Sequence, residues 1–231
     1  MEKEALRYLN KNRLLHIDML EPLRLGEAEC LYGGEDGALI FHRGANAYMI
    51  SAASEAAAAK LALRIPSASL LVTHQPFLRE EMMRRFGLTH QMPCHQAAWL
   101  SALPVPNPPQ ADIRPLTAKD LPVVLHHYTN IPDEGYLRER IGAGMLGIYE
   151  NGEFGGFIGI HEEGSIGMLE IFPAFRRRGL AFTLETAMMA RQQSLGRIPY
   201  AQIKMGNEAS LRLHQKLGME ITQDTPLCWL Y

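Results

Sequence analysis

The stretch from Leu169 to Leu184 constrains the fold of this chain more than any other, because it reads as a strand, a tight basic turn and a helix. The strand is the apolar run from Leu169 to Phe172, which Pro173 ends. The helix is indicated by apolar residues at helical spacing, with Gly196 placed as a C-cap: Leu180, Leu184, Ala187, Met188 and Leu195. A strand that turns directly into a helix predicts a sheet with helices on its faces, the α/β class.

The turn between this strand and this helix predicts a binding site for an anion. Its sequence is Arg176-Arg177-Arg178-Gly179-Leu180-Ala181. The first backbone N–H groups of a helix have no partner within it, and the helix dipole favours a negative group there. Gly179 and Ala181 keep side chains away from such a group, and the arginines add positive charge, so the turn suits a pyrophosphate. The alternative is a helix N-terminus with a solvated basic patch, since the turn lacks the glycine patterns of dinucleotide-binding turns and P-loops.

The composition limits the classes of partner. Of the 231 residues 47% are hydrophobic and 21% charged, which suffices for one large or two small packed domains. A formal net charge of −2 predicts no broad positive field for nucleic acid or a membrane surface. No apolar run approaches the length that spans a bilayer, and the charged start Met1-Glu2-Lys3-Glu4 is unlike a signal peptide. We therefore expect a soluble, cytoplasmic protein without nucleic-acid or membrane partners; whether it forms oligomers is left open.

No metal site is expected. The three cysteines, Cys30, Cys94 and Cys228, are widely spaced and odd in number, which argues against both a metal motif and a disulfide framework. The neighbouring histidines His126 and His127 also lack a metal spacing.

A proline-rich segment at residues 102–112 divides the chain. Its four prolines are typical of a stiff linker: Pro104, Pro106, Pro108 and Pro109. The sequence therefore predicts one domain at residues 1–101 and a second at 113–231.

Apolar periodicity and turn residues predict the elements of each domain. In the first domain helices are expected at 5–20, at 54–61 with Ser54 as N-cap, and at 77–86 before Gly87, and strands at 39–41, 48–50, 70–72 and 97–100. In the second, strands are expected at 113–117, 145–149, 157–161, 166–172, 201–204 and 225–231, with a hairpin turn at Asn151-Gly152. Its helices are expected after Thr117, after the basic turn, and at 207–217 between the caps Asn207 and Gly218.

The two domains share a rhythm of strand, helix, glycine, strand and tryptophan. In the first domain the helix ends at Gly87 and the strand at Trp99; in the second the corresponding residues are Gly218 and Trp229. This pattern indicates an internal duplication, although any two αβ units can share such a rhythm. The first domain lacks an Arg-x-x-Gly-x-Ala turn, so it is expected to bind no pyrophosphate.

A second motif runs from Asn207 to Met219 and reads Asn-Glu-Ala-Ser-Leu-Arg-Leu-His-Gln-Lys-Leu-Gly-Met. Together with the basic turn after Ile171-Phe172-Pro173, it resembles the signatures of the GNAT N-acetyltransferase superfamily. These are a coenzyme A loop, Arg/Gln-x-x-Gly-x-Gly/Ala after Val-x-Pro, and a downstream Asn-x-x-Ser/Ala-x-x-x-Tyr-x-Lys-x-Gly-Phe. Both motifs occur in the family's order, and the resemblance covers residues 113–231.

Within the superfamily the second domain looks most similar to the glycine N-acyltransferase branch. The similarity rests on three segments: Pro173-Ala174-Phe175-Arg176, Leu195-Gly196-Arg197-Ile198-Pro199-Tyr200 and Asn207-Glu208-Ala209. That branch carries a first half related to the same fold, so residues 1–101 resemble a degenerate copy. The resemblance implies a tandem GNAT-like acyltransferase fold of the α/β class, with a mixed sheet in each half.

The resemblance also implies the transfer of an acetyl or short acyl group from acyl-coenzyme A, as co-substrate, to a small amine or amino acid in one ternary complex. The implied cofactor-binding residues are Leu169 and Ile171 through their backbone, Arg176, Arg177, Arg178, Gly179, Leu180 and Ala181 at the pyrophosphate, and Asn207 and Ser210 on the lower arm. An N-cap role explains Asn207 equally well, and both roles can coexist. The alternative function is a sensor or regulatory protein that binds acyl-coenzyme A without turnover.

His214 and Glu170 are the predicted catalytic residues. His214 stands where the family has a tyrosine that protonates the departing thiolate; an imidazolium could do the same, or the histidine could be a packed or surface residue with no proton role. Many relatives carry a glutamate base where this chain has Ser165. Glu162 and Glu163, just before it, are expected to be exposed hairpin carboxylates. Glu170 alternates with Leu169 and Ile171 and faces either the cleft or solvent.

Overall fold

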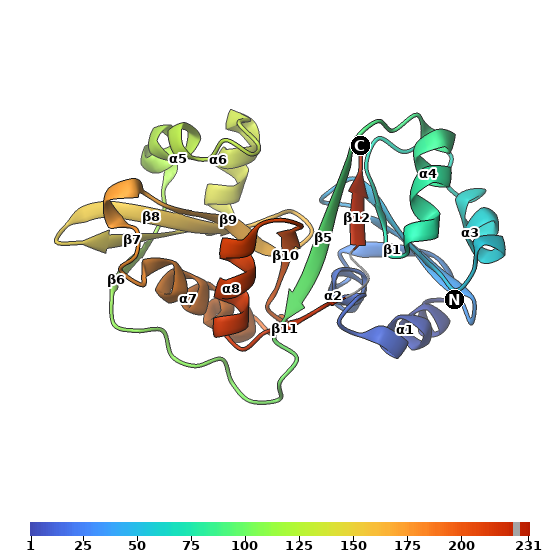
Figure 1. The fold of residues 1–231 in the computed structure, drawn as a ribbon, viewed down its shortest axis with the longest axis horizontal. Helices are drawn as coiled ribbons and strands as arrows, with labels where there is room; N and C mark the ends of the chain where they lie inside the picture. The colour runs from blue at the N-terminus through green and yellow to red at the C-terminus, as the bar shows by residue number, and fades with distance from the viewer. Residues whose placement is uncertain (224–226) are drawn as a thin grey trace. The chain divides into compact units, whose positions relative to one another are not determined.

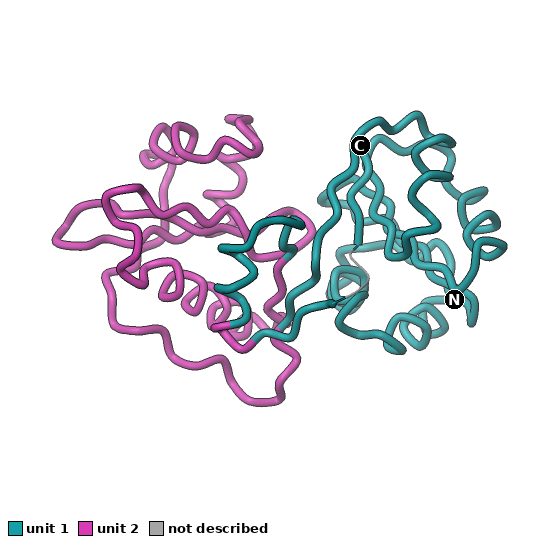
Figure 2. The backbone as a smooth tube through the Cα atoms, viewed as in Figure 1, with its two compact units in different colours: residues 1–98, 202–215, 219–231 teal, residues 99–201, 216–218 magenta. Residues whose placement is uncertain are grey.

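The protein is described by a computed structural model over residues 1–223 and 227–231. The chain folds into two compact units, shown in Figure 2. Unit 1 comprises residues 1–98, 202–215 and 219–231, and unit 2 comprises residues 99–201 and 216–218. These spatial units and the predicted sequence domains are different divisions of the chain, and the domain boundaries stay a prediction.

Unit 1 is built mainly from the first part of the chain (Figure 1). Its helices are α1 (Glu2–Leu9), η1 (Asn10–Asn12), α2 (Ile17–Leu25), α3 (Glu55–Ala62), η2 (Pro76–Leu78) and α4 (Arg79–Phe86). Its strands are β1 (Ala28–Gly34), β2 (Gly37–His42), β3 (Ala47–Ala52), β4 (Leu71–Thr73), β5 (Gln91–Ala98), β11 (Glu220–Ile221) and β12 (Leu227–Leu230). Most of α8 (Glu208–Lys216) and the end of β10 (Tyr200–Lys204) also belong to this unit.

The sheet of unit 1 has the strand order β1-β2-β3-β4-β12-β5, and β11 also pairs with β5. All of these pairs are antiparallel except β3 with β4, which α3 connects. Alternation along each strand sends neighbouring apolar residues to opposite faces. Ile40 and Val72 face a core formed with α1 and α2, whereas Leu39 and Leu71 face a core formed with α3 and α4.

Within unit 2 the strands pair in the order β9-β8-β7-β6. Its strands are β6 (Asp112–Pro115), β7 (Leu146–Glu150), β8 (Glu153–Ile160) and β9 (Ile166–Ile171), and its helices are η3 (Ala118–Asp120), α5 (Leu121–His127), α6 (Glu134–Gly142), η4 (Pro173–Phe175) and α7 (Leu180–Ser194). Helices α5 and α6 form a core with β8 and β9, which includes Phe157 and Met168. Helix α7 packs against β7, β8 and β9 and connects β9 to β10.

Several local predictions are confirmed. Ser54 caps α3, because its side chain accepts a hydrogen bond from the N–H of Ala57 at 3.2 Å. Gly87 ends α4 with a φ of 68°, and Asn151-Gly152 forms the hairpin turn with φ values of 53° and 83°. The mixed α/β class is confirmed as well, with parallel and antiparallel pairs in the same sheet.

Other predictions are wrong or incomplete. The single helix at 5–20 is two helices, because the Asn12 side chain accepts the N–H of Leu15 at 3.2 Å and diverts the backbone between them. Strand β1, helix α6 and the short strand β11 were not predicted. Strand β5 begins earlier than expected, at Gln91, and ends at Ala98. The expected start of the last strand, Thr225, lies outside the described residues, and β12 begins at Leu227.

Within the described ranges no helix is long and apolar enough to cross a membrane. Over the same residues, no group of three or more His, Cys, Asp or Glu side chains is arranged to hold a metal ion. The three cysteines are buried and form no disulfide.

Candidate functional site

Strand β9 of unit 2 presents a partly open edge. Phe172 donates its N–H to the carbonyl oxygen of Gly155 at 2.9 Å, so alternation directs the backbone groups of Leu169 and Ile171 away from β8. On that side the parallel strand β10 pairs with β9 only through Ala201 and Ile166. The backbone of Leu169 therefore has no strand partner there among the described residues, and such an edge can accept an extended ligand.

A bulge accompanies this opening. Met168 has a φ of 55°, which is rare for a residue with a side chain. The pairing of β8 with β9 shifts register at the same place, between Phe157 and Gly159. Bulges bend the strand that contains them, so β9 turns after its single pairing with β10.

The basic turn lies between β9 and α7 and exposes the N-terminus of a 15-residue helix. Gly179 is its N-cap with a φ of 82°, and a Cβ added there would meet nothing within 4 Å. The first helical hydrogen bond runs from the N–H of Thr183 to the carbonyl oxygen of Gly179 at 3.1 Å. The N–H groups of Leu180 and Ala181 therefore have no intrahelical acceptor, and the turn offers an anion both these donors and the positive end of the helix dipole.

The three arginines of the turn have different partners. The Nε of Arg176 donates to the carbonyl oxygen of Ile171 at 2.9 Å and ties the turn to the end of β9. Arg178 forms an ion pair with Glu150 and also donates to the carbonyl oxygen of Ala174 at 2.8 Å. Arg177 is exposed, has a φ of 63°, and forms no hydrogen bond or ion pair with any described residue. Of the three guanidinium groups, that of Arg177 therefore has the fewest contacts within the described residues.

Glu170 lies half-buried on β9. Burial raises the pKa of its carboxyl group, and the nearby Arg176 opposes that shift. By alternation its side chain is on the same face as Phe172, which packs against the core of α5 and α6. Glu170 therefore projects from the side of the sheet that α5 and α6 cover, and its catalytic role stays a prediction. The raised pKa makes the Glu170 carboxylate a stronger base than an ordinary glutamate.

The expectation that Glu162 and Glu163 are exposed is wrong for Glu163, which is only 6% exposed. Ser165 donates its hydroxyl to the Glu163 carboxylate, and Tyr200 donates its hydroxyl to the Glu163 carbonyl oxygen. No local pattern marks this burial, because it depends on a tyrosine from β10. Glu162 is half-buried, and burial raises its pKa.

The predicted residues of α8 belong to unit 1. Asn207 is the N-cap, since its side chain accepts the N–H of Ser210 at 3.1 Å. His214 is 4% exposed, and its Nδ1 donates to the carbonyl oxygen of Ser210 at 2.8 Å. This bond fixes the ring so that a proton for a leaving group would have to be carried on Nε2. His214 is therefore a packed and not a surface histidine; its proton role stays a prediction.

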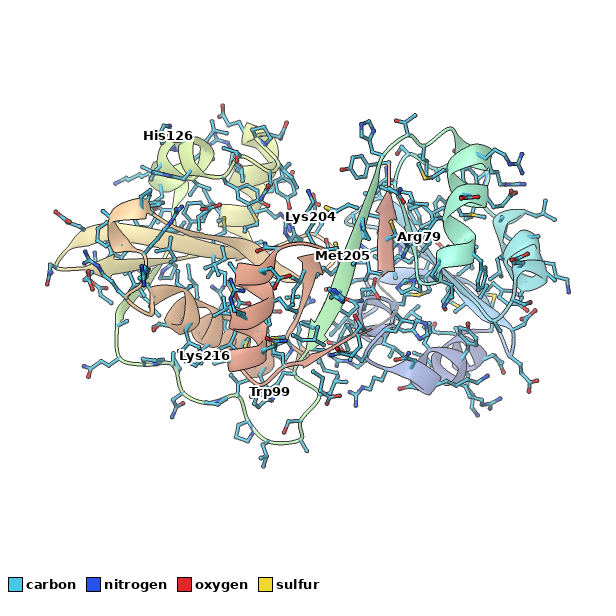
Figure 3. All side chains as sticks on the ribbon, viewed as in Figure 1. Arg79, Trp99, His126, Lys204, Met205 and Lys216 are labelled. Carbon is cyan, nitrogen blue, oxygen red and sulfur yellow. The ribbon has the colours of Figure 1, made fainter. Side chains whose placement is uncertain are left out.

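The predicted site residues thus fall into two groups. Unit 2 brings together Leu169, Glu170, Ile171 and the turn at 176–181, whereas unit 1 brings together Asn207, Ser210 and His214. Lys216, at the end of α8, belongs to unit 2, where its ammonium lies 5.0 Å from the ring centre of Phe182 on α7 (Figure 3).

A comparison with known protein families matches the later part of the chain, which contains the basic turn and α8. A family model described as FR47-like protein matches residues 145–230, which include β9, the basic turn and α8. No curated protein sequence matches the chain.

Solved structures show the fold of the whole chain. A Drosophila protein superposes with a TM-score of 0.66 at 20% identity, over 99% of this chain and 95% of its own. A GCN5-related N-acetyltransferase from Kribbella flavida superposes with a TM-score of 0.58 at 14% identity, over 94% of each chain. A GNAT acetyltransferase from Colwellia psychrerythraea gives 0.54 at 12% identity, over 98% and 97%. The chain therefore has a GNAT-like fold.

Proposed function

We propose that this chain is an N-acyltransferase of the GNAT superfamily, which transfers an acetyl or short acyl group from acyl-coenzyme A to a small amine or amino acid. The observation that carries the proposal is the open edge of β9, which leads directly into the free helix N-terminus at Gly179. An extended arm and a pyrophosphate are joined in this order in coenzyme A. The FR47-like match over residues 145–230 supports the same assignment.

In this proposal the backbone of Leu169 and Ile171 would hold the pantetheine arm by hydrogen bonds along the strand edge. The turn from Arg176 to Ala181 would hold the pyrophosphate through N–H groups and Arg177. The absence of side-chain atoms within 4 Å of the Gly179 Cβ position leaves room for the phosphates. Asn207 and Ser210 would contact the lower arm of the co-substrate.

The proposed chemistry is a direct attack within one ternary complex. Glu170 would take a proton from the acceptor ammonium, and the free amine would attack the thioester carbon. The C–S bond then breaks, and the thiolate takes up one proton, for which His214 is the proposed donor. A backbone N–H directed from Leu169 to the open edge is suited to stabilise the oxygen that becomes negative during the attack.

We also propose that the first half is a degenerate copy that binds no coenzyme A. Unit 1 repeats the element order of unit 2: a three-stranded meander, a crossover helix and a parallel strand. In unit 1 the two parallel strands leave no gap between them, because β3 pairs with β4 at three positions, Tyr48, Met49 and Ile50. Only two residues, Ala53 and Ser54, connect β3 to α3, so no basic turn is formed.

Two experiments test the proposed function. Calorimetry with acetyl-coenzyme A should show binding by the parent protein, and thiol release with a panel of amines and amino acids should show turnover.

In Gly179→Glu the new carboxylate would lie beside the phosphates, and at an effective dielectric of about 20 this repulsion is worth about 4 kcal/mol, roughly a 1000-fold loss of affinity. Gly196→Glu is the matched control, because Gly196 follows the other end of α7 with a φ of 73° and open space around it. Equal affinity in both variants would remove the site from this turn. Binding without turnover for any acceptor would favour the sensor.

A further inference from the structure

His127, the last residue of α5, lies against the extension of β9. Its ring stacks on that of Phe172, with ring centres 3.9 Å apart and planes at 21°. Phe172 directly follows β9 and bonds to Gly155 as a continuation of the strand. Glu170 lies two residues earlier, so the side chains of Glu170 and Phe172 project from the same face about 7 Å apart. His127 and Glu170 therefore lie on one face of β9.

The ring of His127 is suited to accept a proton. Burial lowers its pKa, and the neighbouring His126, exposed on α5 (Figure 3), lowers it further. The two rings meet edge to face at 4.9 Å. Stacking on Phe172 holds the ring plane while leaving the nitrogens at the ring edge, and neither nitrogen hydrogen-bonds to any described residue. A neutral imidazole held in place with uncommitted nitrogens is the state that a general base requires.

The other titratable groups on α5, α6 and β9 are His126, Tyr128 directly after α5, Glu170, and on α6 Glu134, Tyr136, Arg138, Glu139 and Arg140. On α6, Glu134 forms an ion pair with Arg138, and Glu139 lies beside Arg140. Burial raises the pKa of Tyr128 to about 12, so its phenol keeps its proton at neutral pH. Tyr136 is already paired, since its hydroxyl lies 2.6 Å from Nδ1 of His161. His127 is thus an imidazole of this face with a lowered pKa and no hydrogen bond to a described residue.

Resting on the proposed acyl transfer, we propose that His127 is a second proton acceptor for the acceptor amine. An ammonium loses two protons during the reaction. The first leaves before the nitrogen attacks, and the second leaves after the N–C bond has formed. As the C–S bond breaks, sulfur keeps the electron pair and takes up one proton; the other proton passes to solvent. Glu170 and His127 on one face of β9 supply two acceptors for these two protons.

The order of the two transfers follows from acidity. Once bonded to the thioester carbon, the nitrogen carries a positive charge beside an oxyanion carbon and is far more acidic than a free ammonium. A base weaker than an ordinary histidine then suffices, and it returns the proton to solvent easily. His127 therefore suffices as the acceptor in this second step.

The test compares three histidine variants in the full-length protein. His127→Gln should lower kcat by about 10²- to 10⁴-fold, the usual size of a general-base contribution, and leave the KM for acetyl-coenzyme A unchanged. His90→Gln is the matched control, because His90 also stacks on an aromatic ring, that of Tyr231, with ring centres 5.5 Å apart; its kcat should equal that of the parent. His126→Gln removes the charge that holds the pKa of His127 down, so the acid limb of the kcat profile should move to higher pH.

A second measurement does not depend on turnover. The NMR signal of the His127 ring, assigned by its loss in His127→Gln, should titrate below about 6.5 in the parent and move upward in His126→Gln. Turnover of His127→Gln at the parent rate at every pH, or an ordinary titration insensitive to His126, refutes the role of His127 alone. If no acceptor gives turnover in the parent, the proposed function fails and this role fails with it.

Discussion

The buried pair of Asp18 and His74 in unit 1 allows the energetics of the fold to be tested directly. Both side chains are 0% exposed. Nδ1 of His74 donates to the carbonyl oxygen of Ile50 at 3.0 Å, and Nε2 donates to the Asp18 carboxylate at 2.9 Å. With the Asp18 carboxylate ionised, both nitrogens carry hydrogen and the ring is an imidazolium. Burial by itself lowers the pKa of His74, but the Asp18 carboxylate overcomes this and raises it.

Two substitutions at Asp18 should differ in cost. Asp18→Ala removes one partner of a buried ion pair, which typically costs about 3–5 kcal/mol, a large part of the about 5–15 kcal/mol that stabilises a domain. In Asp18→Asn a neutral His74 can keep its Nδ1–H bond to Ile50 and accept the asparagine amide at Nε2. Both ring nitrogens thus keep a hydrogen-bond partner, and we expect a loss of about 1–2 kcal/mol.

The pH dependence gives a stricter test because its sign is fixed. The pKa of His74 is raised above its unfolded value of about 6.5, so its contribution to stability is complete below that pH and is lost as the pH rises through the folded pKa. In Asp18→Asn no carboxylate holds the proton, and this contribution is absent. The difference in unfolding free energy between parent and Asp18→Asn should therefore grow as the pH falls through the raised pKa of His74 toward about 6.5.

Urea unfolding followed by tryptophan fluorescence measures this difference. Trp229 reports on the region of the pair, because its Nε1 donates to Gln202 at 2.5 Å and the amide of Gln202 lies 3.5 Å from Asp18. Trp99 belongs to unit 2, so the series is made in a Trp99→Phe background to leave one tryptophan. A difference that is flat or shrinks as the pH falls would show that His74 is neutral in the folded protein and would refute the ion pair.

Three further predictions follow from other buried contacts. Burial lowers the pKa of His16 to about 4, so stability should fall by roughly 3 kcal/mol between about pH 6.5 and 4, and His16→Gln should lose this slope in urea unfolding. A Cβ at Gly156 would collide with the Glu170 carbonyl oxygen, so Gly156→Ala should cost about 1–3 kcal/mol. Gly142→Ala, which meets nothing within 4 Å, should not destabilise; equal melting temperatures of the two variants would contradict this. A fragment of residues 111–231 leaves β12 without β4 and β5 and should aggregate in size-exclusion chromatography; a monodisperse, active fragment would show that the first half is dispensable.

The sequence predicted the local features of the fold well where one residue type decides them. Ser54, Gly87 and the Asn151-Gly152 turn act through their own backbone or side-chain chemistry, and the structure has them in those roles. The basic turn was found for the same reason, since its glycine and arginines are adjacent. The helix at 5–20 was wrong because apolar spacing does not register a single side chain, that of Asn12, bonded back to the main chain.

Features that depend on distant residues could not be predicted in this way. Strand β12 pairs with β4 and β5, two strands that lie more than a hundred residues earlier in the chain. The burial of Glu163 depends on Tyr200, and the position and lowered pKa of His127 depend on its stacking with Phe172 and on burial by the fold, respectively. In each case the sequence shows an ordinary polar residue, and only the tertiary partner gives it a distinct chemistry.

The contrast between the two halves shows how small a change can separate a closed sheet from an open one. Strand β3 runs straight beside β4 and pairs with it at three positions, whereas β9 bends at Met168 and keeps one pair with β10. The sequence could not predict the positive φ of this methionine, because a methionine side chain neither favours nor requires that conformation. The neighbours of Met168 must impose it, and an added Cβ at Gly159 would lie 3.1 Å from its sulfur. The opening that the proposed function needs is therefore specified by packing around one residue, while the arginines and Gly179 make the opened edge useful to an anion.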